Sequence, residues 1–226
     1  HYAEFIQETK QEIDAGAVGD IGFVLCHMVS PIKSLLEGKQ FLSGEGGVAD
    51  RMFDPAAKTW ADPTVAGDGY ALAQMSHSVG LAYWLTDLKP ERVSSLTSPP
   101  TSAVDIYDAF SVRFTSGAIG SFSGAVALPE NQQFQLDIRI FGSEGVLTIV
   151  CDRALLEILR HDGNNTNLSL KPTAGAHNGS GPTNNLACIV SGKDITNWAS
   201  GWASIRAVEM IDAAYRSMES GSTEFL

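Results

Sequence analysis

The chain has 226 residues, of which 44% are hydrophobic and 18% charged, so it can bury one large core. Its formal net charge of −11 argues against binding to nucleic acid or to anionic membrane surfaces. Cys26, Cys151 and Cys188 are far apart and form no C-x-x-C pair, so we expect neither a disulfide framework nor a structural zinc site. No apolar run approaches the about 20 residues of a membrane span, and we expect a cytoplasmic protein.

The first predicted elements are a helix and a strand. Residues 2–15 carry apolar side chains at helical spacing, which predicts an amphipathic helix. Residues 21–29 (I-G-F-V-L-C-H-M-V) are apolar on both faces, which favours a strand that is covered on both sides. His27 alternates with Phe23 and Leu25 and points to their side. We expect it to be buried there; the alternative is that it reaches a cleft at the end of the strand.

An irregular segment follows, over residues 31–66, with many glycines and prolines and only short periodic pieces. A loop of this length inside a compact domain is usually functional. The patch at 43–47 lacks the glycine spacing of a phosphate-binding loop, and no apolar strand precedes it. Trp60, Asp62 and Lys33 are candidates to line a pocket. The alternative is that these three are ordinary loop residues.

Residues 67–88 organise the rest of the chain. They read as one helix that Asp68 caps and that ends before Pro90. No charged residue occurs between Gly69 and Thr86, and both faces are largely apolar. Such a helix is covered on both sides. We expect the sheet of this chain on one side and a different component on the other.

His77 lies in the middle of the second face, which it shares with Tyr70, Gln74, Leu81 and Trp84. A lone histidine on an apolar helix is more often a core residue than a catalyst. Its polar neighbours, and the glycines ahead of the helix, instead favour the close approach of a ligand. A neutral imidazole can accept a proton near pH 7, which makes His77 the catalytic candidate.

After this helix the apolar pattern changes to a period of two, which predicts strands. These cover residues 92–97, 110–114, 119–128, 134–140, 146–150 and 154–160. Because short turns join them, we expect an antiparallel meander. A surface loop at 161–181, helices at 182–190 and 202–218, and a last strand at 223–226 complete the chain.

This order of elements predicts one α+β domain over residues 1–226. Its open, mainly antiparallel β-sheet carries helices on one face. The other face mixes Ser, Thr, Gln, Asp and Arg with Ala and Val.

Three parts of the chain resemble the Gfo/Idh/MocA oxidoreductases, the glucose–fructose oxidoreductase and inositol dehydrogenase-like family. They are the junction at 12–21 (E-I-D-A-G-A-V-G-D-I), the Gly-rich helix start at 67–77 followed by W-L-T-D-L-K-P, and the sheet turns and closing helix at 110–120, 142–147 and 213–226. The resemblance covers only the second half of such proteins. Their N-terminal Rossmann domain has a G-x-G-x-x-G turn that binds NAD or NADP, followed by a catalytic lysine in an E-K-P motif. Neither motif occurs here.

The resemblance implies that this chain is a substrate and oligomerisation domain without its cofactor domain. The chain begins with His1 instead of Met, which favours the same interpretation. The parent would transfer a hydride between a nicotinamide and a secondary alcohol of a sugar, cyclitol or related polyol. His77 would take the hydroxyl proton and Gln74 would orient the substrate. Tyr70, Trp60 and Trp84 would form walls of the pocket. The isolated chain is expected to bind no cofactor and to be inactive.

One departure from the family supports a different reading. Family dehydrogenases often carry an Asp one turn before the histidine, where this chain has Ala73 with Gln74 beside it. Glutamine cannot relay a proton as a carboxylate can. The alternative is therefore a non-catalytic ligand-binding or regulatory member, and a scaffold domain without a site is a third reading. The outer sheet face resembles the surface through which family members pair, so we expect a homo-oligomer.

Overall fold

The computed structural model describes residues 1–39, 56, 58–98, 103–129, 131–171, 174 and 179–226. The strands are β1 (Ile21–Val29), β2 (Pro90–Thr97), β3 (Tyr107–Phe114), β4 (Ile119–Ala125), β5 (Gln135–Gly142), β6 (Gly145–Val150), β7 (Leu155–Arg160), β8 (Thr166–Ser169) and β9 (Glu224–Phe225). The α-helices are α1 (Glu4–Asp14), α2 (Lys33–Leu36), α3 (Pro63–Ala66), α4 (Ser76–Thr86), α5 (Ser180–Val190) and α6 (Gly201–Ser220). A π-turn, Ala71–Met75, leads into α4, and a 3₁₀ turn, Cys151–Arg153, precedes β7.

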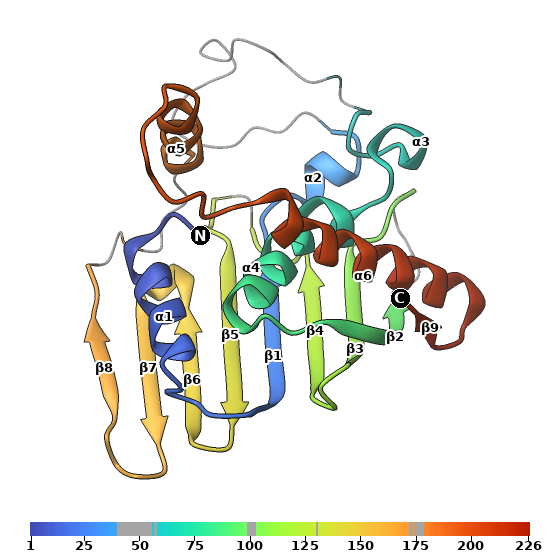
Figure 1. Ribbon diagram of the computed structural model, residues 1–226. Helices are drawn as coiled ribbons and strands as arrows, with labels where there is room; N and C mark the ends of the chain where they lie inside the picture. Colours follow the sequence, from blue (N-terminus) through green and yellow to red (C-terminus); the bar gives the residue numbers. More distant parts are fainter. Residues whose placement is uncertain (40–55, 57, 99–102, 130, 172–173, 175–178) are drawn as a thin grey trace.

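The strands form one open nine-stranded sheet in the order β8-β7-β6-β5-β1-β4-β3-β2-β9. Helices α1, α4 and α6 lie across one face of this sheet (Figure 1). Neighbouring strands are antiparallel except for β1 and β4, which are parallel. The predicted α+β class, with an open and mainly antiparallel sheet, is confirmed. None of the described helices combines the length and the apolar character that crossing a bilayer requires.

The predicted meander is wrong at the centre of the sheet. Strands β4 and β5 follow each other in sequence, but β1 lies between them: Val24 faces Gly120 of β4 on one side and Ile140 of β5 on the other. Periodicity shows that a segment is a strand but not which strand it pairs with. The strongly apolar β1 takes the central place, where the helices cover it. A smaller difference is β8, an edge strand within the segment that we predicted to be a loop.

The two faces of β1 are not equally covered. Cys26 and Met28 point under the helices and are buried, whereas Leu25 and His27 point to the opposite face and are only partly buried. Nδ1 of His27 lies 2.8 Å from Oγ of Ser123 on β4. Within this chain, β1 is therefore covered on one face only, although we predicted cover on both. The prediction that His27 is buried is also wrong, because its side chain is only partly buried. It lies on the sheet face that α1, α4 and α6 leave open.

Helix α4 is apolar all round because it is packed on several sides. It contacts the sheet through β1 and also contacts α1 and α6. Tyr83 meets the rings of Phe114 and Phe122 edge-on, each at 5.8 Å between ring centres. On the other side, Gly80 lies against Ala207 of α6. We expected a different component on the second face of α4. Helix α6 of the same chain instead packs against much of that face.

Candidate active site

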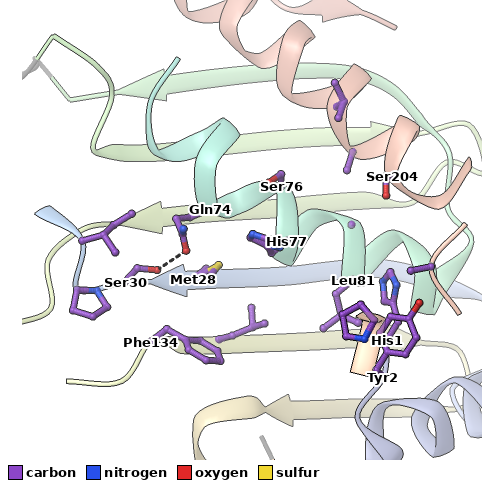
Figure 2. Close-up of a pocket in the computed structure, with 18 residues that line it drawn as sticks. His1, Tyr2, Met28, Ser30, Gln74, Ser76, His77, Leu81, Phe134 and Ser204 are labelled. Carbon is purple, nitrogen blue, oxygen red and sulfur yellow. Dashed lines mark hydrogen bonds between the residues drawn. The ribbon is translucent and has the colours of Figure 1, made fainter. Parts of the chain in front are cut away.

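A cavity of about 820 Å³ lies beside the start of α4, at the end of β1 (Figure 2). The residues around it come from distant parts of the chain: the N-terminus, the end of β1, α4, the segment before β5, and the first half of α6. Its polar side chains include Ser30, Gln74, Ser76, His77 and Ser204, and its apolar side chains include Met28, Ile32, Leu81, Phe134, Leu136 and Val208. No Asp, Glu, Lys or Arg is among the described residues that line it.

His77 lies on the first turn of α4 and lines this cavity. Its side chain is exposed, whereas its neighbours Ser78 and Val79 are buried. The alternative reading of His77 as a core histidine is therefore wrong for this chain. Figure 2 shows its ring on the cavity side of the helix. The position allows contact with a ligand, and the catalytic role stays a prediction.

Gln74 lies one turn before His77, on the π-turn, and also lines the cavity. The hydroxyl of Ser30 donates to Oε1 of Gln74 over 3.4 Å (Figure 2). Figure 2 shows the two side chains, from β1's end and from the helix, converging at one end of the cavity. Sequence reasoning missed Ser30, although a polar residue that directly follows an apolar strand is a usable signal for a site at the strand's end.

Tyr70 is not a cavity wall, contrary to the sequence-based expectation. It is fully buried, and its hydroxyl donates to the carbonyl oxygen of Met28 over 3.1 Å. A Cβ atom at position 124 would collide with the Tyr70 ring, so Gly124 on β4 makes room for it. Ideal helical spacing put Tyr70, Gln74 and His77 on one face. The π-turn changes the angle per residue, and Tyr70 points into the sheet instead.

The three loop candidates do not line the cavity. Asp62 caps α3, where its carboxylate accepts from the Thr64 hydroxyl over 2.7 Å and from the Thr64 amide over 3.0 Å. These two bonds, the hydroxyl bond first, lower the pKa of Asp62. Lys33 lies 3.8 Å from the carboxylate of Glu37 in an exposed ion pair. Trp60 is partly buried and packs against the core. The structure thus favours the ordinary-residue reading for all three. The glycine patch at 43–47 lies outside the described residues.

The helix start is capped by Asp105 rather than by Asp68. Asp105 precedes β3, and its carboxylate accepts from the amides of Gly69, over 2.9 Å, and Ala71, over 2.8 Å. Backbone amides at a helix start have no partner within the helix, so a carboxylate there stabilises it. Burial and the nearby Asp105 raise the pKa of Asp68.

Tyr215 of α6 completes this cap. Its hydroxyl donates to Asp105 over 3.0 Å and accepts from the amide of Leu72 over 3.2 Å. Burial, and then the charge of Asp105, raise the pKa of Tyr215, so its hydroxyl stays protonated. We refer to Asp105 and Tyr215 as the helix clamp. It holds the π-turn, which carries Gln74 and leads into α4 with His77. No local sequence pattern indicates this clamp.

No group of three or more His, Cys, Asp or Glu side chains in the described part of the chain is placed to hold a metal ion. The cavity also does not fit the pyrophosphate of a dinucleotide. Phosphates are bound by Arg and Lys side chains or by glycine-rich helix starts, and no Arg or Lys is among the described residues that line the cavity. Its mixture of apolar walls and hydroxyl, amide and imidazole groups fits an uncharged ligand or an aromatic ring.

The sequence matches the model of the GFO/IDH/MocA C-terminal domain over residues 6–148, and the chain belongs to this family. Comparison with curated proteins gives no match. Among solved structures, an oxidoreductase domain protein from Kribbella flavida has a TM-score of 0.72 at 19% identity, over 99% of this chain and 63% of that one.

Two further similar structures contain a cofactor. GenD2 from gentamicin A biosynthesis, solved with NAD, has a TM-score of 0.68 at 19% identity, over 100% of this chain and 61% of GenD2. Levoglucosan dehydrogenase with NADH and levoglucosan has a TM-score of 0.67 at 17% identity, over 96% of this chain and 62% of the enzyme. At these identities the likeness concerns the fold. The chain spans about three fifths of the length of these proteins.

Proposed function

We propose that this chain forms the substrate half of an NAD(P)-dependent oxidoreductase that acts on a secondary alcohol of a sugar, cyclitol or related polyol. The observation that carries the proposal is the placement of His77 and Gln74, one helical turn apart, in a cavity of about 820 Å³ in a domain of this family. The dehydrogenase and GenD2 structures with NADH or NAD support a nicotinamide cofactor for the parent.

Each side chain then has a task. A bound nicotinamide supplies the hydride acceptor, and a basic side chain accepts the hydroxyl proton. Two described histidines line the cavity, His1 and His77, and a neutral imidazole suits that step near pH 7. We assign the step to His77 because it lies one helical turn after Gln74. Gln74 hydrogen-bonds a substrate oxygen and fixes its distance from the imidazole. The apolar walls, with Leu81 and Phe134, limit access of water.

The lining also favours one class of substrate. Transfer of a charged group from water into a site without a partner of opposite charge is strongly unfavourable. The described cavity walls offer no Arg or Lys for a carboxylate or phosphate. We therefore expect neutral polyols and sugars to be preferred over sugar acids and sugar phosphates.

The test is turnover by the full-length protein. Purified protein with NAD or NADP is offered matched pairs of substrates, each a neutral sugar and its acid or phosphate, and formation of reduced nicotinamide is followed. The proposal expects turnover of a neutral member of the panel and a lower kcat/KM for its charged partner. Absence of turnover with any polyol, in either direction, would contradict the proposal.

The observation at Ala73 favours a second candidate, a non-catalytic ligand-binding member. Ala73 stands where a carboxylate would be placed one turn before His77, and its methyl group cannot relay a proton. In that case calorimetry detects binding of a neutral sugar to the full-length protein, while no cofactor is reduced. Binding and turnover measured on one preparation separate the two candidates.

A further inference from the structure

Two buried hydroxyl groups lie behind Gln74. Oγ of Ser30 is 3.0 Å from the hydroxyl of Tyr70, and the two residues are 1% and 0% exposed. Tyr70 also donates to the carbonyl oxygen of Met28, and Ser30 donates to Oε1 of Gln74 over 3.4 Å. Burial raises the pKa of Tyr70 to about 12, so it remains a hydroxyl donor at neutral pH.

The direction of these bonds decides which end of Gln74 meets a ligand. Ser30 donates its single hydrogen to Oε1 of Gln74, so it can only accept from Tyr70. The one hydrogen of Tyr70 is then shared between two acceptors, the Ser30 oxygen at 3.0 Å and the Met28 carbonyl oxygen at 3.1 Å. Successive hydroxyl bonds of this kind strengthen one another. With the amide oxygen held towards Ser30, the two N–H donors of Gln74 are the end left for the cavity (Figure 2).

We propose that Tyr70 and Ser30 are positioning residues that hold the carboxamide of Gln74 with its N–H donors towards the cavity, so that the site selects an uncharged ligand with an oxygen acceptor at this point. The inference rests on the proposed function, because the ligand is the polyol substrate named there. It assigns Tyr70 a place behind the site instead of in its wall, and it makes Gln74 a donor to the substrate.

The first test does not depend on catalysis. Side-chain amide signals of Gln74 are recorded by NMR in the full-length protein without ligand and identified as the pair missing in Q74E. The mobility of this amide should be low in the wild type and clearly higher in S30A and Y70F. Y83F is the matched control, since Tyr83 is equally buried and its hydroxyl has no partner among the described residues. Unchanged mobility of Gln74 in S30A would overturn the proposal.

The second test separates positioning from packing. Y70F removes the bond to Met28 as well as the one to Ser30, whereas S30A leaves the Tyr70–Met28 bond in place. Both variants should raise KM for the neutral substrate about 3- to 10-fold, the value of one neutral hydrogen bond. A rise in Y70F alone would mean that Tyr70 only holds the helix to β1, and would overturn the proposal.

Q74E tests the donor assignment. Glutamate keeps an acceptor for Ser30 but offers no N–H to the cavity. Its KM should rise at least as much as that of S30A, and a wild-type KM would mean that the substrate donates to position 74. If the wild type turns over no polyol at all, the proposed function fails, and the NMR comparison still decides whether Ser30 and Tyr70 hold Gln74.

Discussion

Asp108 is a carboxylic acid within the sheet core. It lies on β3, is 4% exposed, and neither of its oxygens has a hydrogen-bond partner among the described residues. Burial, followed by the nearby Asp105, raises the pKa of Asp108 from 3.8 to about 9. A buried carboxylate without a partner is costly, so the group stays protonated in the folded protein at neutral pH.

This predicts a specific pH dependence of stability. Between the unfolded pKa of 3.8 and the folded value of about 9, the folded state binds more protons than the unfolded state at Asp108. The free energy of unfolding therefore falls as pH rises through this interval. D108N removes this titration, so the variant should lose less stability than the wild type between about pH 5 and pH 8 in urea unfolding.

D162N is the control for that experiment. The ion pair with Arg160 lowers the pKa of Asp162 to about 2, so its carboxylate is ionised throughout the same pH range in the folded and the unfolded state. The free energy of unfolding of D162N should therefore change with pH as it does in the wild type. A D108N protein with the wild-type slope would mean that Asp108 is ionised in the folded state.

At the scale of elements, the helix clamp links α4 and α6 to the cavity. D105A removes the acceptor of two helix-start amides and of the Tyr215 hydroxyl. The loss of a capping carboxylate should lower the free energy of unfolding by about 1–2 kcal/mol and speed hydrogen exchange at the Ala71 amide. D68A removes the carboxylate that we predicted from the sequence to be the cap. This variant should change the free energy of unfolding by about 0.5 kcal/mol or less. Equal effects of the two variants would contradict the assignment of the cap.

The elements differ in how far the sequence could predict them. Period-two and helical patterns located most strands and the four helices of eleven or more residues, α1, α4, α5 and α6. The place of β1 in the sheet, the π-turn and the clamp depend on contacts between residues far apart in the chain. His77 and Gln74 were found because their helix could be recognised. Ser30 and Asp105 were missed because only folding brings them to that helix.

At the scale of the whole molecule, the open sheet face is the main exposed surface without helices. Leu25 is partly exposed there, and Ile119 and Leu159 are 49% and 47% exposed on neighbouring parts of the sheet. Apolar groups on such a face favour association. We propose that a second copy of the chain covers it, as the family resemblance implies.

A charge at the centre of that face tests the association. L25E should shift the full-length protein towards the monomer in sedimentation velocity, because the carboxylate would be buried without a partner in the interface. V65E is the control, since Val65 is 64% exposed on α3, away from the sheet. A mass unchanged by L25E would rule out this face as the interface.

The central claim is that this chain contributes the residue that takes the substrate proton. The most direct measurement is kcat of the full-length H77A variant with the best neutral substrate, beside H161A, which removes an exposed histidine after β7. The account predicts a loss of about 10²-fold or more for H77A and wild-type turnover for H161A. A wild-type kcat for H77A would contradict it.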